Sequence, residues 1–279
     1  MTPHYVDWYP SIEAKNEGND TKIVKHIQKG EVRMTSNAPM NRYRSTAAVV
    51  GSIYLAGFVV GIGGDTLLQS ILGAPNHLAL VAANSLTVTI GALLWLIAVV
   101  GDAAHGVLLY PVLKPHNERI AVGYLAARIM DALFIAVMVL FVLLQIPLGS
   151  EYLNAATADA AELQALSNVL MQAKFYVYDM GMITLGISGI LLCYTLYRTK
   201  LLPRWLAVWG LVGYAIIFCG MVSEIMESGL GLASSIPGGL WEVFVGVWLI
   251  VKGFNAPALV AETAKSEPKM RDEMSLSAT

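Results

Sequence analysis

Charged residues and cysteines are scarce in this sequence. Only 14% of its 279 residues are charged, while 56% are hydrophobic and the mean hydropathy is +0.60. A soluble globular domain has about 25% charged residues, so these values exclude that class and favour a polytopic membrane protein. The two cysteines, Cys193 and Cys219, are expected at different depths from one membrane face, which makes a disulfide between them unfavourable. No basic stretch interleaved with aromatic residues suggests nucleic acid as a partner.

Sequence signatures of common hydrolases and nucleotide-dependent enzymes are also missing. The sequence contains no H-E-x-x-H pair, no G-x-S-x-G elbow and no glycine-rich phosphate loop. We expect no metal site, and the sequence leaves open whether the protein is an enzyme and whether it uses a cofactor. Any catalysis would have to be general acid–base catalysis by carboxyl groups.

Six apolar segments dominate the chain. Each is long enough to cross the hydrocarbon core of a bilayer as a helix, which takes about 20 residues. The sequence therefore predicts an all-α fold, a six-helix transmembrane bundle in contact with the lipid bilayer. The segments cover residues 47–69, 79–110, 121–146, 167–197, 204–226 and 237–253.

The basic residues alternate between successive connections of these segments. Connections 70–78, 147–166 and 227–236 contain no Lys or Arg, whereas 111–120 and 198–204 each contain at least two. By the positive-inside rule, both termini are predicted to be cytoplasmic.

Polar segments flank the predicted bundle at both ends. We expect three regions: a cytoplasmic polar arm at 1–43, the six-helix transmembrane domain at 44–254, and a disordered cytoplasmic tail at 255–279. The oligomeric state is left open.

Glu242 lies near the middle of the last apolar segment. It precedes Lys252, which marks a membrane face, by ten residues, so its carboxyl lies about 15 Å deep, close to the midplane. Glycines share its helical face and allow close helix packing. An ionised carboxylate at this depth is costly unless it is paired, wetted or protonated, so Glu242 is predicted to point into the bundle.

Every predicted span carries at least one acidic residue on or beside a stripe of small or polar residues. Intramembrane ionisable residues usually face the bundle interior, which predicts a shared polar core with an inner and an outer group. The inner polar network comprises Arg128, Asp131, Asp102 and His105. The candidates for substrate or ion binding are Glu242, Asp65, Asp179, Glu224 and Tyr176.

Structural interpretations compete with these functional ones. Arg128 can pair with Asp131 one turn along its helix or with Asp102, and such a pair can simply fix helix orientation. His105 is expected as a hydrogen-bonded partner of Asp102 rather than a metal ligand. On the first span, Gly57-x-x-x-Gly61 is expected to pack closely against another helix.

Tyr176, Tyr178 and Lys174 are better explained as an interfacial aromatic belt with a lysine that reaches toward the headgroups. The outer acids are harder to explain structurally, because crowded carboxylates with few cations cannot all stay ionised. At least one should be protonated, or a bound cation should neutralise them.

Three short motifs stand out in the second half of the apolar region. They are Tyr194-Thr-Leu-Tyr197-Arg198, Leu202-Pro203-Arg204-Trp205-Leu206 and Trp241-Glu242 followed by Gly246, Trp248 and Lys252-Gly253-Phe254. These motifs resemble those of a bacterial family of integral membrane proteins known only as a domain of unknown function (DUF4386). The resemblance covers about residues 44–254 and implies a helical membrane fold in the bacterial cytoplasmic membrane, with a Glu at the position of Glu242. It implies no activity, substrate or cofactor.

These observations support three hypotheses about function. The first is binding or permeation of a proton, a cation or a small cationic solute through the intramembrane carboxylates, with Glu242 as the central group. The second is an intramembrane acid–base enzyme that acts on a lipid or isoprenoid substrate, in which a protonated carboxyl serves as general acid. The third is an accessory membrane subunit without a site of its own.

Overall fold

The computed structural model describes the backbone of residues 17–255 and the side chains from Tyr43 to Asn255. Residues 1–16 and 256–279, which include most of the predicted tail, lie outside the described part. Contacts divide the chain into two units, Met1–Arg42 and Tyr43–Thr279. In the first unit the backbone is helical from Glu17.

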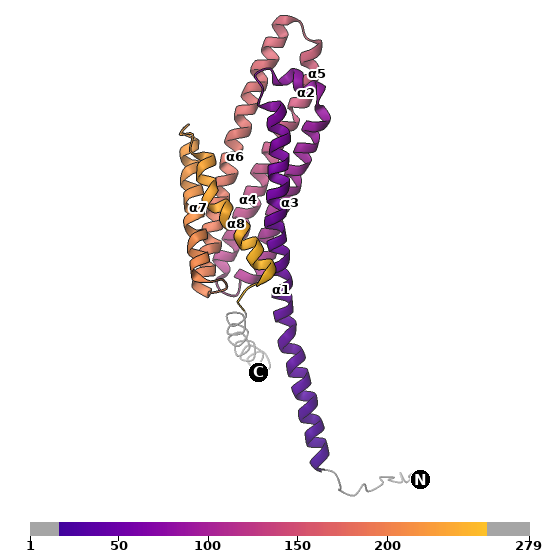
Figure 1. The fold of residues 1–279 in the computed structure, drawn as a ribbon, viewed down its shortest axis with the longest axis vertical. Helices are drawn as coiled ribbons and strands as arrows, with labels where there is room; N and C mark the ends of the chain where they lie inside the picture. The colour runs from indigo at the N-terminus through magenta and orange to yellow at the C-terminus, as the bar shows by residue number, and fades with distance from the viewer. Residues whose placement is uncertain (1–16, 256–279) are drawn as a thin grey trace, which may run out of the picture. The chain divides into compact units, whose positions relative to one another are not determined.

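All regular structure in the described part is helical (Figure 1). Six helices or helix pairs are long and apolar enough to cross a membrane, which confirms the predicted six-helix bundle. The protein is therefore an integral membrane protein. The helices are α1 (Glu17–Leu72), α2 (His77–Ala83), α3 (Ser85–Leu113), α4 (Glu118–Leu143), α5 (Gln145–Asn154), α6 (Thr157–Thr199), α7 (Arg204–Glu224) and α8 (Gly231–Val251).

Two short helices, α2 and α5, modify the predicted spans. The second apolar segment was expected to begin at residue 79, but the chain breaks at Asn84 and α2 forms a separate helix. The Asn84 side-chain amide donates to the Leu80 carbonyl at 2.9 Å, so it satisfies the end of α2 and interrupts the helix. Helix α2 then packs against α5, which continues the third span beyond Leu143.

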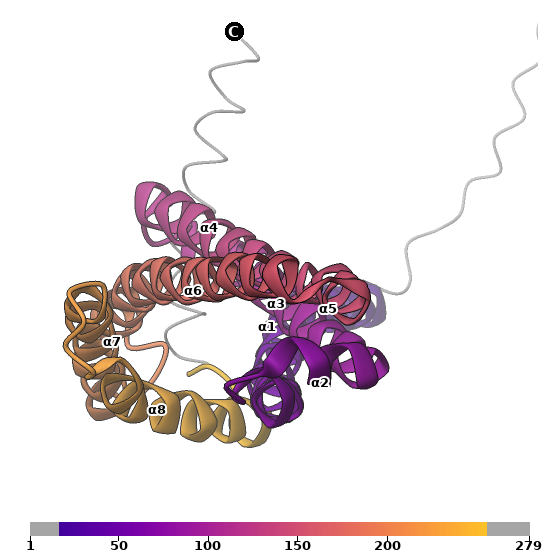
Figure 2. The same cartoon turned by 90° about the horizontal axis from the view of Figure 1, so that it is seen from above.

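The spanning helices pack in a ring (Figure 2). Helix α3 contacts α4, α4 contacts α6, α6 contacts α7, and α7 contacts α8. Helix α1 closes the ring at two glycine contacts. A Cβ on Gly51 would lie 2.5 Å from the Gly246 carbonyl of α8, and one on Gly64 would lie 3.0 Å from the Gly91 carbonyl of α3. Only glycine permits these close approaches.

The predicted close packing through Gly57 and Gly61 is wrong. A Cβ built on either glycine meets nothing within 4 Å, because both face open space between α1 and its neighbours. The spacing was right for a packing motif, but the contacting glycines of α1 are Gly51 and Gly64.

The two ends of the bundle differ in their side chains. We call one end, which carries Arg44, Lys114, Arg204 and Lys252, the basic end, and the end formed by α2, α5 and the α7–α8 turn the distal end. A buried apolar cluster fills the basic end and includes Leu109, Leu113, Leu196, Leu201, Leu206, Val245, Leu249 and Phe254. A second cluster packs the distal end and includes Leu68, Val81, Val88, Ile135, Met138 and Val142.

Arg44 fastens α1 to the end of α8. Its guanidinium donates hydrogen bonds to the carbonyls of Leu249, Ile250 and Val251 at 3.3, 2.8 and 2.9 Å. These carbonyls belong to the last turn of α8, where a cation is favourable; of the three, the Leu249 carbonyl also accepts the Gly253 N–H at 3.1 Å. The basic end of the ring is thereby held closed.

Candidate functional site

A cavity of about 870 Å³ lies within the ring of helices, and residues of α1, α3, α4, α6, α7 and α8 line it. Most of its lining is apolar. It reaches the outer surface of the bundle, because Ile62 and Leu232 line it and are still 64% and 85% exposed. Its ionisable lining residues are Asp65, Asp102, His105, Arg128, Lys174 and Glu242.

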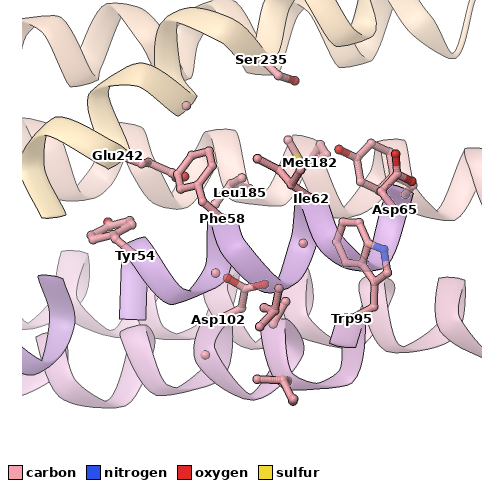
Figure 3. A pocket seen from close by; sticks show the side chains of 18 of the residues that line it. Tyr54, Phe58, Ile62, Asp65, Trp95, Asp102, Met182, Leu185, Ser235 and Glu242 are labelled. Atoms are coloured by element: carbon pink, nitrogen blue, oxygen red, sulfur yellow. The ribbon is translucent and has the colours of Figure 1, made fainter. Parts of the chain in front are cut away.

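Glu242 lines the cavity from α8 (Figure 3). Its Oε1 accepts a 2.7 Å hydrogen bond from the Tyr214 hydroxyl of α7. Within Tyr43–Asn255 this carboxylate forms no ion pair. Its other acceptor positions remain for a group inside the cavity.

The preceding residue, Trp241, fixes this part of α8. Its ring is fully buried, and its indole N–H donates to the Leu206 carbonyl at 2.7 Å. The Tyr214 ring packs edge-on against it with centroids 5.4 Å apart. A Cβ on Gly210 would meet the same indole, so this glycine makes room for it. These contacts hold Tyr214 and Glu242 in one orientation.

Arg128 organises the polar groups on the other wall. Its guanidinium lies 2.5 Å from Asp102 Oδ1 on α3 and 3.0 Å from Asp131 Oδ2, one turn along α4. The arginine therefore pairs with both acids that the sequence offered as alternatives. Two carboxyl groups share one buried guanidinium, so this group carries an excess negative charge only when both carboxyls are ionised.

His105 contacts Arg128 rather than Asp102, so the expected Asp102–His105 hydrogen bond is wrong. Its Nε2 lies 3.2 Å from the Val50 carbonyl, and its Nδ1 lies 3.3 Å from Arg128 Nη2. Because a carbonyl only accepts and a guanidinium only donates, Nε2 carries the proton and Nδ1 is bare. Tyr54 packs on the imidazole with centroids 4.2 Å apart. His105 thus links α1 to the Arg128 group as a neutral residue.

Only part of the predicted outer group of acids lines the cavity. Asp65 lines the cavity, whereas Asp179 and Glu224 do not, although their charges act on each other. Glu224 accepts a 2.8 Å hydrogen bond from the Gly231 N–H and so closes the α7–α8 turn. Tyr176 is 36% exposed and lies outside the cavity. Of the outer acids, only Glu242 and Asp65 belong to the site.

Lys174 and Tyr178 belong to the cavity, which corrects their interpretation as an interfacial belt. Lys174 is only 6% exposed, and Tyr178 packs edge-on against Trp95 with centroids 6.3 Å apart. Helical spacing could have found them, because Lys174, Tyr178, Met182 and Leu185 follow the repeat i, i+4, i+8, i+11. The candidates chosen from the sequence on this helix were Tyr176 and Asp179 instead.

A second buried polar cluster was missed entirely. Ser167 on α6 lies 2.5 Å from His77 Nε2 on α2 and donates to Gln145 Oε1 on α5, also at 2.5 Å. All three are buried and none lines the cavity. They join α2 and α5 to α6 at the distal end.

The described residues contain no group of three His, Cys, Asp or Glu side chains arranged to hold a metal ion. The cavity can instead offer a carboxylate, a cation and a large apolar surface to an organic ligand.

Comparison with known proteins gives a family without an assigned activity. The family model for a domain of unknown function, DUF4386, matches residues 49–253, which include every ionisable residue that lines the cavity. No curated protein and no solved structure shows a match to the chain. Since the match extends over most of the sequence and over all six spanning helices, the chain belongs to the DUF4386 family.

Proposed function

We propose that this protein binds a small hydrophobic cation in the cavity of its bundle, with Glu242 as the carboxylate that receives the positive charge. The observation that carries the proposal is that Glu242 lines a largely apolar cavity with one neutral hydrogen-bond partner, Tyr214, and no ion pair within Tyr43–Asn255.

The charges of the lining favour a cation. Asp65, Asp102 and Glu242 carry negative charge when ionised, and only Arg128 and Lys174 carry positive charge. Arg128 already forms ion pairs with Asp102 and with Asp131. Electrostatic attraction is strong in such a poorly hydrated site, so an ammonium group would gain most beside Glu242.

The apolar part of the lining favours a ligand with a hydrocarbon body. Phe58, Met182 and Leu185 face the cavity near Glu242 (Figure 3). If the ligand were a hydrated inorganic cation, these apolar side chains would be in contact with its hydration water. An alkylammonium ion would bury its chain against them at about 25 cal/mol per Å² of apolar surface.

The geometry supports binding more than open permeation. The apolar cluster at the basic end, with Leu109, Leu196 and Leu249, lies between Glu242 and that end of the bundle. A hydrated path through this cluster would require the helices to separate. The Arg128–Asp131 pair would then serve as a fixed wall of the site.

The distribution of basic residues supports a placement in the bacterial cytoplasmic membrane with both termini cytoplasmic. The basic end then faces the cytoplasm. The cavity would lie in the opposite half of the membrane and open toward lipid and the outer surface.

Equilibrium binding of radiolabelled dodecylamine to the protein in nanodiscs tests the proposal, with empty nanodiscs as the blank. We expect Glu242→Gln to weaken binding at least about tenfold, which corresponds to about 1.4 kcal/mol. The matched control is Glu227→Gln, because Glu227 is exposed and outside the cavity. Gly61→Leu provides a second test. Its side chain would fill open space in the cavity, so we expect it to weaken dodecylamine binding. Equal binding by Glu242→Gln and the wild type would rule the proposal out.

The apolar surroundings of Glu242 also favour an intramembrane acid–base enzyme as a second candidate. A protonated Glu242 held by Tyr214 could donate its proton to an alkene or epoxide of a lipid or isoprenoid. Mass spectrometry of lipids extracted from membranes with wild-type or Glu242→Gln protein would reveal a product that only the wild type forms. Identical lipid profiles would count against the enzyme.

The third candidate, an accessory subunit without a site of its own, predicts that these acidic residues are dispensable. It requires an Asp65/Glu224/Glu242 triple amide variant to behave as the wild type in cells.

A further inference from the structure

Lys174 is a buried cation that the proposed function leaves unused. It is 6% exposed and lines the cavity from α6. Its ammonium lies 4.6 Å from the centroid of the neighbouring Phe175 ring, and the charge of Asp65 acts on it. Yet between Tyr43 and Asn255 no side chain or carbonyl forms a hydrogen bond or ion pair with it.

Such a placement is unfavourable without a partner. A lysine near the end of a membrane helix normally extends its flexible stem so that the ammonium reaches the headgroups. An ammonium that stays inside the protein loses its hydration, which costs several kcal/mol unless hydrogen bonds replace the water. The three donors of Lys174 are therefore available to an acceptor inside the cavity.

Glu242 lies at one end of the cavity, and Asp65, whose charge acts on Lys174, lies at the other. Figure 3 shows Glu242 and Asp65 at either end, with Phe58 and Ile62 between them. The glycine contacts of α8 place Glu242 level with the turn of α1 around Tyr54. Asp65 lies eleven residues further along α1 (65 − 54 = 11), a rise of about 16 Å at 1.5 Å per residue.

We infer that the site is bipolar and takes an elongated ligand with an ammonium group at one end and an oxyanion such as a carboxylate at the other. This inference rests on the proposed function, because the ammonium end is the group that Glu242 receives. The oxyanion accepts hydrogen bonds from Lys174, while the apolar chain between the two ends packs against Phe58 and Met182. The charge of Asp65 acts on the Lys174 ammonium and favours its charged form at this end of the cavity.

Two probes with the same number of carbon atoms test the inference: dodecylamine, and ω-aminododecanoate, in which a carboxylate replaces the terminal methyl group. Their affinities are measured for the protein in nanodiscs, with empty nanodiscs as the blank. We expect the wild type to bind ω-aminododecanoate at least about tenfold more tightly than dodecylamine. Lys174→Met, which keeps the length of the side chain and removes its charge, should bring the ratio of the two affinities to about one. Lys174→Arg should restore a preference for ω-aminododecanoate.

The outcomes separate this inference from the proposed function. If dodecylamine binds in a Glu242-dependent manner but ω-aminododecanoate has no advantage, or if Lys174→Met keeps that advantage, the bipolar site is overturned and the cation site stands. If dodecylamine does not bind, or binds equally to Glu242→Gln, both are overturned. Thermal midpoints of the Lys174 variants establish that each is folded.

Discussion

The Tyr214 hydroxyl donates a 2.7 Å hydrogen bond to Oε1 of Glu242 across the α7–α8 contact. Tyr214 is 1% exposed, and its ring is held between Gly189 of α6 and Trp241 of α8. A Cβ on Gly189 would overlap the Tyr214 ring, so that glycine is required for the ring to occupy its place. The orientation of the central carboxylate is thus set by three helices that pack around one tyrosine.

Tyr214→Phe should remove this bond and leave the packing of the ring intact. We expect a loss of about 1 kcal/mol of stability, the usual contribution of one hydrogen bond, and weaker dodecylamine binding because Glu242 loses its fixed orientation. Thermal unfolding and nanodisc binding measure the two effects. Tyr194→Phe is the control, since Tyr194 is 44% exposed and outside the cavity. Unchanged binding in Tyr214→Phe would contradict an orienting role.

Arg128→Met should destabilise the protein strongly. The substitution leaves Asp102 and Asp131 without their shared cation, and removal of one partner from a buried pair costs about 3–5 kcal/mol. The variant Arg128→Met/Asp102→Asn/Asp131→Asn removes both stranded charges, so it should recover most of the loss. Thermal unfolding of the single and triple variants provides the comparison. If Arg128→Met unfolds at the wild-type temperature, the pairs do not stabilise the bundle.

The sequence was sufficient for the six spans, because long apolar runs have few alternatives to a membrane helix. It also identified Arg128 with Asp131, since residues three apart on a helix are neighbours. The two partners of Ser167 could not be found in this way. His77 and Gln145 are separated from it by 90 and 22 residues, and only the packing of α2, α5 and α6 brings them together.

Two of the four outer acids, Asp179 and Glu224, lie outside the cavity for a related reason. Spacing along one helix predicts which residues share a face, but the angle at which that face meets the next helix depends on packing. On their own helices, Asp179 and Glu224 share a polar face with residues of the bundle interior. The cavity, however, is lined by Asp65 and Lys174 and not by these two acids. The position of Glu242 in the bundle interior was predictable from the sequence, whereas its partner Tyr214 required the contact between α7 and α8.

Glycines on α1 should respond differently to alanine according to what faces them. In Gly51→Ala the new methyl group would lie 2.5 Å from the Gly246 carbonyl, so α1 and α8 must separate, at a cost of about 1–3 kcal/mol. In Gly61→Ala the methyl group meets nothing within 4 Å, and alanine favours a helix by about 1 kcal/mol over glycine. The thermal midpoint should fall for the first variant and hold or rise for the second. Equal losses in both would contradict the open space at Gly61.

Ser167→Ala should loosen the distal end of the bundle without changing the cavity. The serine hydroxyl bonds to both His77 and Gln145, which are buried, so its removal leaves two polar groups without this partner. Each such group costs about 1–3 kcal/mol. Hydrogen exchange resolved by segment should therefore accelerate in α2 and α5, while α7 and α8 stay as protected as in the wild type. Ser150→Ala is the matched control, because Ser150 is an exposed residue of α5. Unchanged exchange in α2 would show that the apolar contacts of Leu78 and Val81, both fully buried, hold this helix by themselves.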